Sequence, residues 1–430
     1  MKRAKTLLIA QLLTVGAVLI EPRLAVAQGG IPNCQDLVTP TNPVVVYMGG
    51  TTAVIPVIRL MGARLRKYAG VTLLWNENDD GCHSVSLLTS AAPTQQRIVF
   101  SYYDEVPNQP GAIIISTCNG PLNRVPDLVI NDVSWTSCLL SYGSTGVPAP
   151  LRSGLKEFSG PVQGLVPIVS SEYNYTNYIS VEELQDLYIC GANGNVVTFS
   201  LGYEIFDYNS LSSGMRELWA RGIGVKNGSA LTTQIGLGSS SNITAEGMLT
   251  IYVAPTTSPN QTIGYTSTEF YDQYRGEVNA LKVRGVNQNL AYWPDSDKTS
   301  TDKINIREGR YTIQGALKLV APVDSSGVPT NIDVKHMIDW FQENPVQDPS
   351  LQLPFDVNEI YALRGVVPQC AMKVTKDGDE PVFKHYQAPA PCHCSFQVLA
   401  TGKTCIPGCT ACTDSSTCPT GKICSHGYCE

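Results

Sequence analysis

The sequence has little charge, no basic block and few histidines. Only 16% of its 430 residues are Asp, Glu, Lys or Arg, and the formal net charge is −7. A charged fraction this low argues against a disordered chain, because disordered segments are normally rich in charge. A pI near 5.4 with no run of Lys or Arg leaves no electrostatic footprint for nucleic acid. The composition therefore indicates a globular protein with no nucleic-acid partner.

Common catalytic motifs are also missing. The sequence contains no G-x-S-x-G elbow and no H-E-x-x-H pair, and it has five His in all. His83 lies in an acidic loop, His336 lies on a predicted helix face, and the other three lie toward the C-terminus. Each is expected to be structural or solvated. Because no nucleophile, base or metal site stands out, we expect no enzyme activity, no cofactor and no metal.

The first 27 residues have the three parts of a secretory signal peptide. Lys2, Arg3 and Lys5 supply the positive start, 7–20 is the apolar stretch, and 25–27 is a small-residue cleavage site. A transmembrane anchor is the alternative, but the apolar stretch is well short of the ~20 residues needed to span a bilayer. Cleavage removes four positive charges and one negative charge, so the net charge falls from −7 to about −10. We expect an acidic protein that is secreted, periplasmic or at the cell surface, with no transmembrane anchor after signal removal.

Cysteine is absent between Cys190 and Cys370, whereas the last 61 residues hold nine of the 14 Cys. In an oxidising compartment such a cluster predicts a disulfide framework, because a short segment with few large apolar residues cannot bury enough surface alone. Zinc binding through Cys409-x-x-Cys412 and nearby His is the alternative. Eight Cys leave roughly a hundred pairings open. The disulfide candidates of this predicted module, 392–430, are Cys392, Cys394, Cys405, Cys409, Cys412, Cys418, Cys424 and Cys429.

The body of the chain, 28–369, alternates β-rich runs with helical patterns and shows no internal repeat. This alternation predicts an α/β architecture with mostly parallel strands. The expected strands are 44–47, 71–75, 98–102, 113–116, 128–130 and 165–170, and the expected helices are 54–65, 180–190, 213–219 and 331–342.

Three polar segments lie where predicted elements begin or end. Gly49-Gly50-Thr51-Thr52 joins a strand to a helix, so its backbone N–H groups suit an anion; a glycine turn with a Thr cap is the alternative. Asp132 follows the strand 128–130 directly, at the edge where open parallel sheets bind ligands; an Asx-turn is the alternative. The segment 226–233 offers one Lys and several hydroxyls; an ordinary polar loop is the alternative.

The order of these segments resembles the periplasmic phosphate-binding proteins of bacterial ABC transporters, over roughly 40–320. A Gly-Ser/Ala-Thr turn of that family is similar to Gly50-Thr51-Thr52, and a Ser-Asp pair that grips a protonated phosphate oxygen is similar to Asn131-Asp132. An Ile-Ser-x-Glu-Glu-Leu run is similar to 179–184, and an Arg-Ser-x-Gly-Ser-Gly-Thr loop is similar to 226–232. The motifs gain weight from their common order.

The chain also departs from the family's pattern. Lys226 stands where the family has Arg, which keeps the charge but loses a bidentate fork for an oxyanion. Ala230 and Leu231 replace Ser-Gly. In place of a Gly/Ser-rich second loop the chain has Asn78-Asp79-Asp80, and two added carboxylates repel a phosphate. The resemblance therefore implies the fold more strongly than the ligand.

The resemblance implies a two-lobed, type 2 periplasmic-binding-protein-like α/β fold plus a small disulfide-rich C-terminal module. The implied function is an extracytoplasmic solute-binding protein for phosphate or a similar oxyanion, received by an ABC permease. The alternative is a secreted or cell-surface structural or interaction protein on the same scaffold. The implied segments are a signal peptide 1–27, lobe one 28–150 and 263–369, lobe two 151–262, a linker 370–391 and the module 392–430. The implied ligand residues are Gly50, Thr51, Thr52, Asp132, Lys226, Ser229 and Thr232.

Overall fold

The computed structural model describes most of the chain from Ile31 onward. The described residues are 31–76, 81–88, 97–109, 111–122, 124–142, 154–174, 176–190, 204–205, 213–231, 262–343, 352–379 and 381–430. The predicted signal peptide, the acidic segment 78–80 and the predicted ligand residue Thr232 lie outside these ranges.

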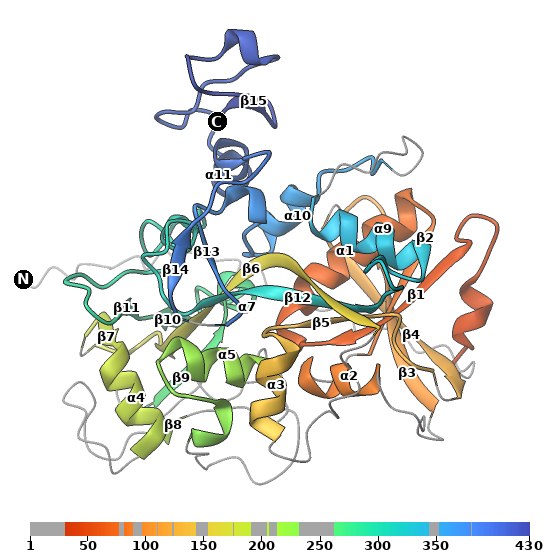
Figure 1. Ribbon diagram of the computed structural model, residues 1–430, viewed down its shortest axis with the longest axis horizontal. Helices are drawn as coiled ribbons and strands as arrows, with labels where there is room; N and C mark the ends of the chain where they lie inside the picture. The colour runs from red at the N-terminus through yellow and green to blue at the C-terminus, as the bar shows by residue number, and fades with distance from the viewer. Residues whose placement is uncertain are drawn as a thin grey trace, which may run out of the picture.

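A mixed ten-stranded sheet forms the centre of the molecule (Figure 1), in the order β4-β3-β2-β1-β5-β12-β6-β9-β8, with β10 paired to β6. Strand β1 is parallel to β2 and β5, but β12 is antiparallel to both β5 and β6. The predicted strands are confirmed, whereas the expectation of mostly parallel pairing is wrong. Its members are β1 Val44–Gly50, β2 Val71–Trp75, β3 Arg97–Glu105, β4 Ile113–Leu122, β5 Leu128–Asn131, β6 Leu155–Ser170, β8 Glu204–Ile205, β9 Thr262–Ser267, β10 Val278–Ala280 and β12 Gln314–Pro322.

Helices cover both faces of this sheet, and the four predicted helices are confirmed. In α9 the predicted face, Val334, Met337, Ile338 and Phe341, is buried. The α-helices are α1 Ile55–Tyr68, α2 Gly81–Leu87, α3 Trp135–Tyr142, α4 Val181–Cys190, α5 Gly214–Gly222, α7 Thr268–Gln273, α8 Ile304–Arg307, α9 Ile332–Phe341, α10 Val357–Leu363 and α11 His393–Thr401. None of the helices in the described ranges is long and apolar enough to cross a membrane.

Short elements complete the fold. The capping box predicted at the start of α4 is present, because the Ser180 backbone N–H donates to the Glu183 carboxylate (2.8 Å) and the Glu183 N–H donates to Ser180 Oγ (3.2 Å). The remaining strands pair in twos, and they are β7 Tyr178–Ser180 with β11 Lys282–Arg284, β13 Val374–Lys376 with β14 Phe383–His385, and β15 Cys424–Ser425 with β16 Tyr428–Cys429. The 3-10 turns are η1 Cys34–Leu37, η2 Thr52–Val54, η6 Gly228–Ala230, η9 Gln369–Ala371 and η10 Ser415–Thr417.

Two large hydrophobic clusters give the chain two lobes. One contains α1, α9, α10 and strands β1, β2 and β5; the other contains α4, α5 and strands β6 and β9. The long strand β6 joins them, because 155–164 pairs with β12 and 165–169 pairs with β9. The predicted lobe boundaries stay a prediction. The packing suggests a different one, since Ile263, Tyr265 and Ile313 all belong to the cluster of β6 and β9.

The disulfides correct part of the prediction for the C-terminal module. Cys394–Cys409, Cys412–Cys424 and Cys418–Cys429 form inside it as expected. Cys392, however, pairs with Cys370 upstream, and Cys405 is free and exposed. The Cys392 N–H donates to the Cys370 carbonyl (3.0 Å), so the backbone aligns these two residues before their side chains pair. Two further disulfides, Cys34–Cys118 and Cys82–Cys138, lie in the body.

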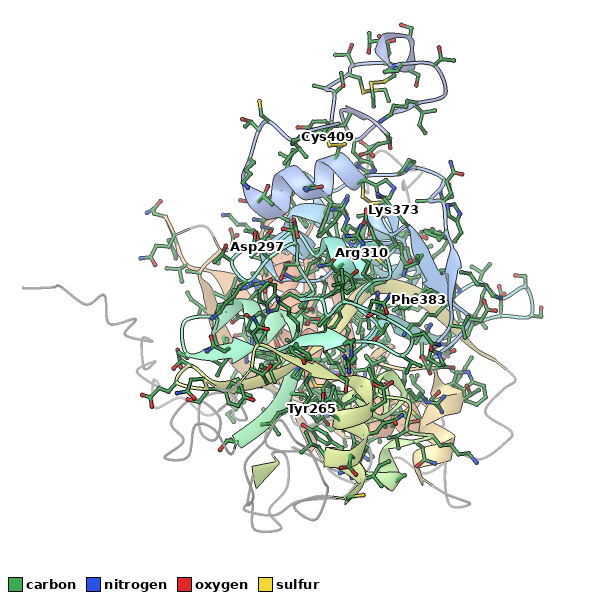
Figure 2. All side chains as sticks on the ribbon, turned by 90° about the vertical axis from the view of Figure 1, so that its left-hand side faces the viewer. Tyr265, Asp297, Arg310, Lys373, Phe383 and Cys409 are labelled. Carbon is green, nitrogen blue, oxygen red and sulfur yellow. A yellow bond between two sulfur atoms is a disulfide. The ribbon has the colours of Figure 1, made fainter. Side chains whose placement is uncertain are left out.

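The segment predicted as a linker forms the hairpin β13–β14, which contacts both clusters. Lys376 Nζ donates to the carbonyl of Gln314 at 2.7 Å. The carboxylate of Asp379 accepts from the Ser134 N–H (2.7 Å) and from the Ser137 hydroxyl, so it caps α3. Figure 2 shows Lys373 and Phe383 on this side of the molecule, and the module beyond Cys409 projects above them. The hairpin therefore straps the region where β6 and β12 pass between the lobes.

We predict two free thiols in the oxidised protein. All 14 Cys lie in the described residues, and Cys190 and Cys405 are both exposed and outside the disulfides. Alkylation of the unfolded, unreduced protein, followed by peptide mass spectrometry, is expected to label these two positions. Reduction first is expected to expose the rest. Label at Cys392 without reduction would contradict the pairing of Cys370 with Cys392.

We also predict that Glu343 lowers stability as the pH rises. Its carboxyl oxygens are buried within 4.8 Å of the sulfur atoms of Cys370 and Cys392. Burial, and then the charge of Asp356, raise the pKa of Glu343 to about 8. Because the folded state then binds this proton more tightly than the unfolded state, stability is lost as the pH rises from about 4.5 to about 8.

The variant Glu343→Gln lacks this penalty. At about pH 8.5 it is expected to be more stable than the parent protein by on the order of 2–4 kcal/mol, with little difference near pH 4. Urea unfolding at both pH values measures this. An equal difference at the two pH values would show that the carboxyl does not titrate in this way.

Candidate functional site

The glycine turn after β1 is held tightly against β5. Gly50 has φ +142°, and a Cβ there would lie 1.9 Å from the carbonyl oxygen of Ile130, so only glycine fits. The Thr51 N–H donates to that carbonyl at 2.9 Å. The Thr51 hydroxyl accepts from the Ala53 N–H (3.2 Å) and caps the turn η2 that leads into α1. Thr51 is buried, and Thr52 is half-buried.

Asp132 lies directly after β5, as predicted, and is fully buried. Gln163 of β6 donates its side-chain N–H to Asp132 Oδ1 at 2.5 Å. The Asp132 N–H donates to the Asn131 side-chain oxygen (2.9 Å), and the Asn131 amide donates to the sulfur of Cys138 (3.0 Å). The disulfide Cys82–Cys138 therefore braces the loop that carries Asp132.

The N-terminus of α5 comes up against Asp132. A Cβ on Gly214 would lie 2.3 Å from Asn131 Oδ1 and 2.8 Å from Asp132 Oδ2, so glycine permits this approach. The Ser213 hydroxyl accepts from the Arg216 N–H (3.3 Å) and caps the helix. Trp219 of α5 stacks on Tyr265 of β9 at 4.4 Å between ring centroids, which fixes the helix on its sheet. Tyr265 is labelled in Figure 2.

The end of β9 adds a second carboxyl. Thr268 accepts from the Gly164 N–H (3.3 Å), and its hydroxyl donates to Glu269 Oε2 (3.3 Å). Glu269 is 1% exposed. Burial, and to a smaller extent the charges of Asp132 and Asp272, raise the pKa of Glu269 well above its ordinary value. We call Thr51, Asp132, Gln163, Thr268 and Glu269 the polar cluster.

The structure brings together only part of the predicted ligand set. Gly50, Thr51 and Asp132 lie at adjoining strand ends. Lys226 is exposed, and within the described ranges no hydrogen bond or ion pair joins it to Thr51 or Asp132. Ser229 belongs to η6, and Thr232 lies outside the described residues. The roles of these three residues therefore stay predictions.

Arg216 holds the Lys226 loop against α5. Its guanidinium is buried and donates to the carbonyls of Gly228 and Leu231, both at 2.9 Å. The Gly228 N–H donates to the buried Glu217 carboxylate at 2.6 Å. These contacts tie η6 to the helix.

Three residues of the site were missed by the sequence analysis: Gln163, Gly214 and Glu269. Ser213-Gly214 directly before a predicted helix was a readable signal, because that arrangement presents backbone N–H groups. Glu269 follows the buried run that begins Thr262-Ile-Gly-Tyr265, as Asp132 follows its own strand. Gln163 carries no such signal, because it lies inside a long strand.

The polar cluster is suited to hydrogen bonding rather than to charge pairing. The described hydrogen bonds of Thr51, Gln163 and Glu269 involve no Lys or Arg. The neighbouring segments 77–80, 191–212 and 232–261 contain no Lys or Arg in their sequence. An anion here is therefore held by backbone N–H groups, hydroxyls and helix N-termini.

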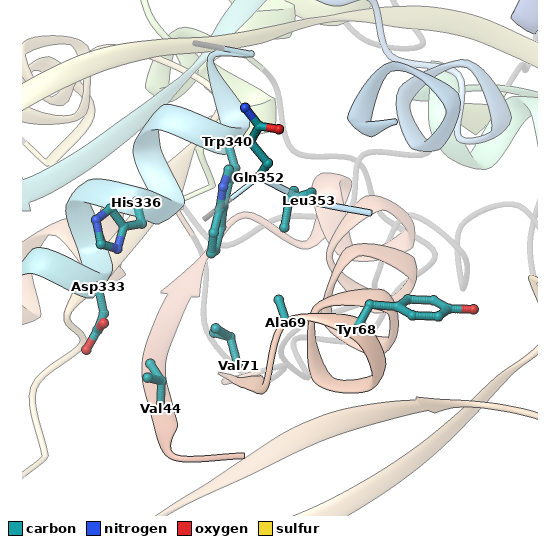
Figure 3. A pocket seen from close by; sticks show the side chains of 9 residues that line it. All are labelled: Val44, Tyr68, Ala69, Val71, Asp333, His336, Trp340, Gln352 and Leu353. Atoms are coloured by element: carbon teal, nitrogen blue, oxygen red, sulfur yellow. The ribbon is translucent and has the colours of Figure 1, made fainter. Parts of the chain in front are cut away.

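A separate cavity of about 140 Å³ lies at the opposite end of β1 and β2 (Figure 3). Trp340, Leu353, Ala69 and Val71 form apolar walls, and the polar side chains of Asp333, His336 and Gln352 lie at its margin. Because the strands that end at Gly50 and Trp75 begin here, the cavity is remote from the polar cluster.

We predict that Gly50→Ala destabilises the protein by roughly 2–4 kcal/mol, because the new Cβ meets the Ile130 carbonyl and φ is positive. Gly276→Ala is the matched control, since a Cβ there meets nothing within 4 Å. It is expected to change stability by no more than about 0.5 kcal/mol. Urea unfolding of both variants measures the difference. Equal effects would show that the turn is not held as described.

A scan against protein-family models finds no match to this chain, and a search of curated proteins finds none either. Solved structures do match, and several are phosphate-binding proteins.

An ABC-type phosphate transport receptor from Vibrio cholerae is 14% identical, with a TM-score of 0.42, and the match covers 75% of this chain and 99% of that one. The periplasmic phosphate-binding protein PfluDING is 13% identical, with a TM-score of 0.43 over 76% of this chain and 90% of that one. PstS from Borrelia burgdorferi is 16% identical, with a TM-score of 0.34 over 70% and 97%.

The regulator OxyR from Corynebacterium glutamicum also matches, at 7% identity and a TM-score of 0.35 over 70% of this chain and 65% of that one. The predicted resemblance and the two-lobed α/β fold are thus confirmed as similarities of fold, and the ligand has to be argued from the site.

Proposed function

We propose that this chain is an extracytoplasmic solute-binding protein that binds phosphate or a similar oxyanion at the polar cluster. One observation carries the proposal. The carboxyl ends of β1 and β5 and the N-terminus of α5 converge on the buried residues Thr51 and Asp132, where β6 passes between the lobes. Ligands of open α/β sheets bind at such strand ends.

The chemistry of this point suits a protonated oxyanion. Backbone N–H groups at the N-terminus of α5 and in the Thr51 turn are donors in the region where helix dipoles favour negative charge. The Asp132 carboxylate is an acceptor and can take a hydrogen bond from a P–OH group. An oxyanion without a proton leaves that carboxylate facing a like charge.

The order of the sequence motifs supports phosphate among the oxyanions, since Gly50-Thr51-Thr52 and Asn131-Asp132 resemble the family's phosphate-binding turns. The acidic composition weakens long-range attraction of an anion, so capture depends on short-range donors.

Export is supported by the cysteines. Six disulfides are typical of an oxidising compartment and are rare in the cytosol. With the predicted signal peptide, this supports a periplasmic, secreted or surface location. Uptake through an ABC permease follows from the family resemblance alone.

A second candidate is a cell-surface interaction protein on the same scaffold. Its support is the C-terminal module, which projects from the body (Figure 1) and is largely exposed. Deleting 410–430 removes the intact pairs Cys412–Cys424 and Cys418–Cys429 and leaves Cys394–Cys409 in place. Loss of surface attachment with unchanged phosphate binding would favour this function.

We predict that calorimetry detects phosphate binding and that Asp132→Asn weakens it by about tenfold or more, because a buried acceptor for the P–OH group is lost. Asp36→Asn is the control, since Asp36 is exposed in η1. No heat and no thermal shift with millimolar phosphate would refute the proposed function.

Lys226→Ala tests the predicted ligand loop. A loss as large as that of Asp132→Asn would support a ligand role for Lys226. Unchanged affinity would assign recognition in this lobe to the N-terminus of α5.

A further inference from the structure

Glu269 is a buried carboxyl whose hydrogen bonding is incomplete. It opens α7 directly after β9 and is 1% exposed. Its Oε2 accepts from the Thr268 hydroxyl at 3.3 Å, whereas Oε1 has no hydrogen-bond partner among the described residues. A buried polar atom left without a partner costs free energy, so it calls for an explanation.

A short chain of contacts connects Glu269 to Asp132. Thr268 bonds both Glu269 and the Gly164 N–H, and the adjacent Gln163 donates to Asp132. Gln163 Oε1 likewise has no partner among the described residues. Helix α7 also packs against η2, the turn that Thr51 caps. Two incompletely bonded side chains therefore border the space where the ligand is proposed to lie.

The charges around Glu269 disfavour its ionised form. The charged groups that act on it are Asp132, after β5, and Asp272, on its own helix. Asp272 is itself paired with Arg275 at 2.6 Å and with Lys303 at 2.8 Å, which leaves no cation of that network for Glu269. Burial is the largest cause of the raised pKa of Glu269.

We propose that Glu269 stays neutral and donates a hydrogen bond from its carboxyl group to the bound oxyanion, so that the site selects a singly charged, protonated oxyanion. This inference rests on the proposed function. A neutral carboxyl supplies one O–H donor, which replaces the cation that this site lacks. Asp132 then accepts from the ligand while Glu269 donates to it, so the two carboxyls have opposite roles.

The first test compares phosphate affinity with and without a titrating carboxyl. Glu269→Gln keeps an N–H donor at every pH. Its affinity is expected to be within about threefold of the parent at pH about 6, and about tenfold or more tighter than the parent at pH about 8.5, where Glu269 begins to ionise. Titration of the ligand is common to both proteins and cancels. Glu277→Gln, at an exposed position beyond α7, is expected to follow the parent.

The outcomes separate this inference from the proposed function. Phosphate binding with parallel pH curves for the parent and Glu269→Gln would overturn the role of Glu269 and leave the proposed function standing. Absence of phosphate binding by the folded parent at every pH would overturn both.

A second measurement needs only the parent protein. If the site takes a singly charged oxyanion, binding at about pH 8 must take up a proton from the buffer, because dissolved phosphate is then mostly doubly charged. Calorimetry in two buffers of different ionisation enthalpy is expected to show uptake approaching one proton for each phosphate bound. Uptake near zero would overturn the inference.

Discussion

The antiparallel pairing of β6 with β12 is the interaction on which the rest of this structure depends. Strand β12 pairs with β5 on one side and with β6 on the other, so it closes the first lobe around Asp132. Strand β6 then continues into the second lobe and pairs with β9. This continuity places Gln163 beside Asp132 and brings the end of β9, with Glu269, into the same region. The hairpin β13–β14 covers the crossing, and the Cys370–Cys392 disulfide ties its ends.

Close approach of backbone is the second constraint. Gly50 allows the turn after β1 to meet the Ile130 carbonyl, and Gly214 allows α5 to meet Asn131 and Asp132. Each position leaves no room for a side chain. Donors on two lobes therefore point to one small volume that a larger residue would have filled. Such a site selects by hydrogen bonding, because it combines two buried carboxyls with a neighbourhood poor in cations.

Much of the fold was predictable because its signals are local. Alternating and 3.6-residue apolar patterns predicted β1, β2, α1 and α9, and the Ser180–Glu183 pair predicted the start of α4. The strand direction in the centre of the sheet was mispredicted, because β12 returns from a distant part of the chain and its orientation leaves no local pattern. Cys370 was likewise assigned to the linker, since only the hairpin between Cys370 and Cys392 brings the two together.

The sequence by itself determined an acidic, cysteine-rich chain with glycine turns and an acidic residue at the ends of buried strands, since these features depend on neighbours along the chain. Only the tertiary structure decided which polar residues meet. Gln163 and Glu269 reach Asp132 from strands 31 and 137 positions later in the sequence, and Lys226, the more conspicuous candidate, lies exposed. The physical reason is that strand order and close packing decide which residues become neighbours, and neither property is written in any short segment.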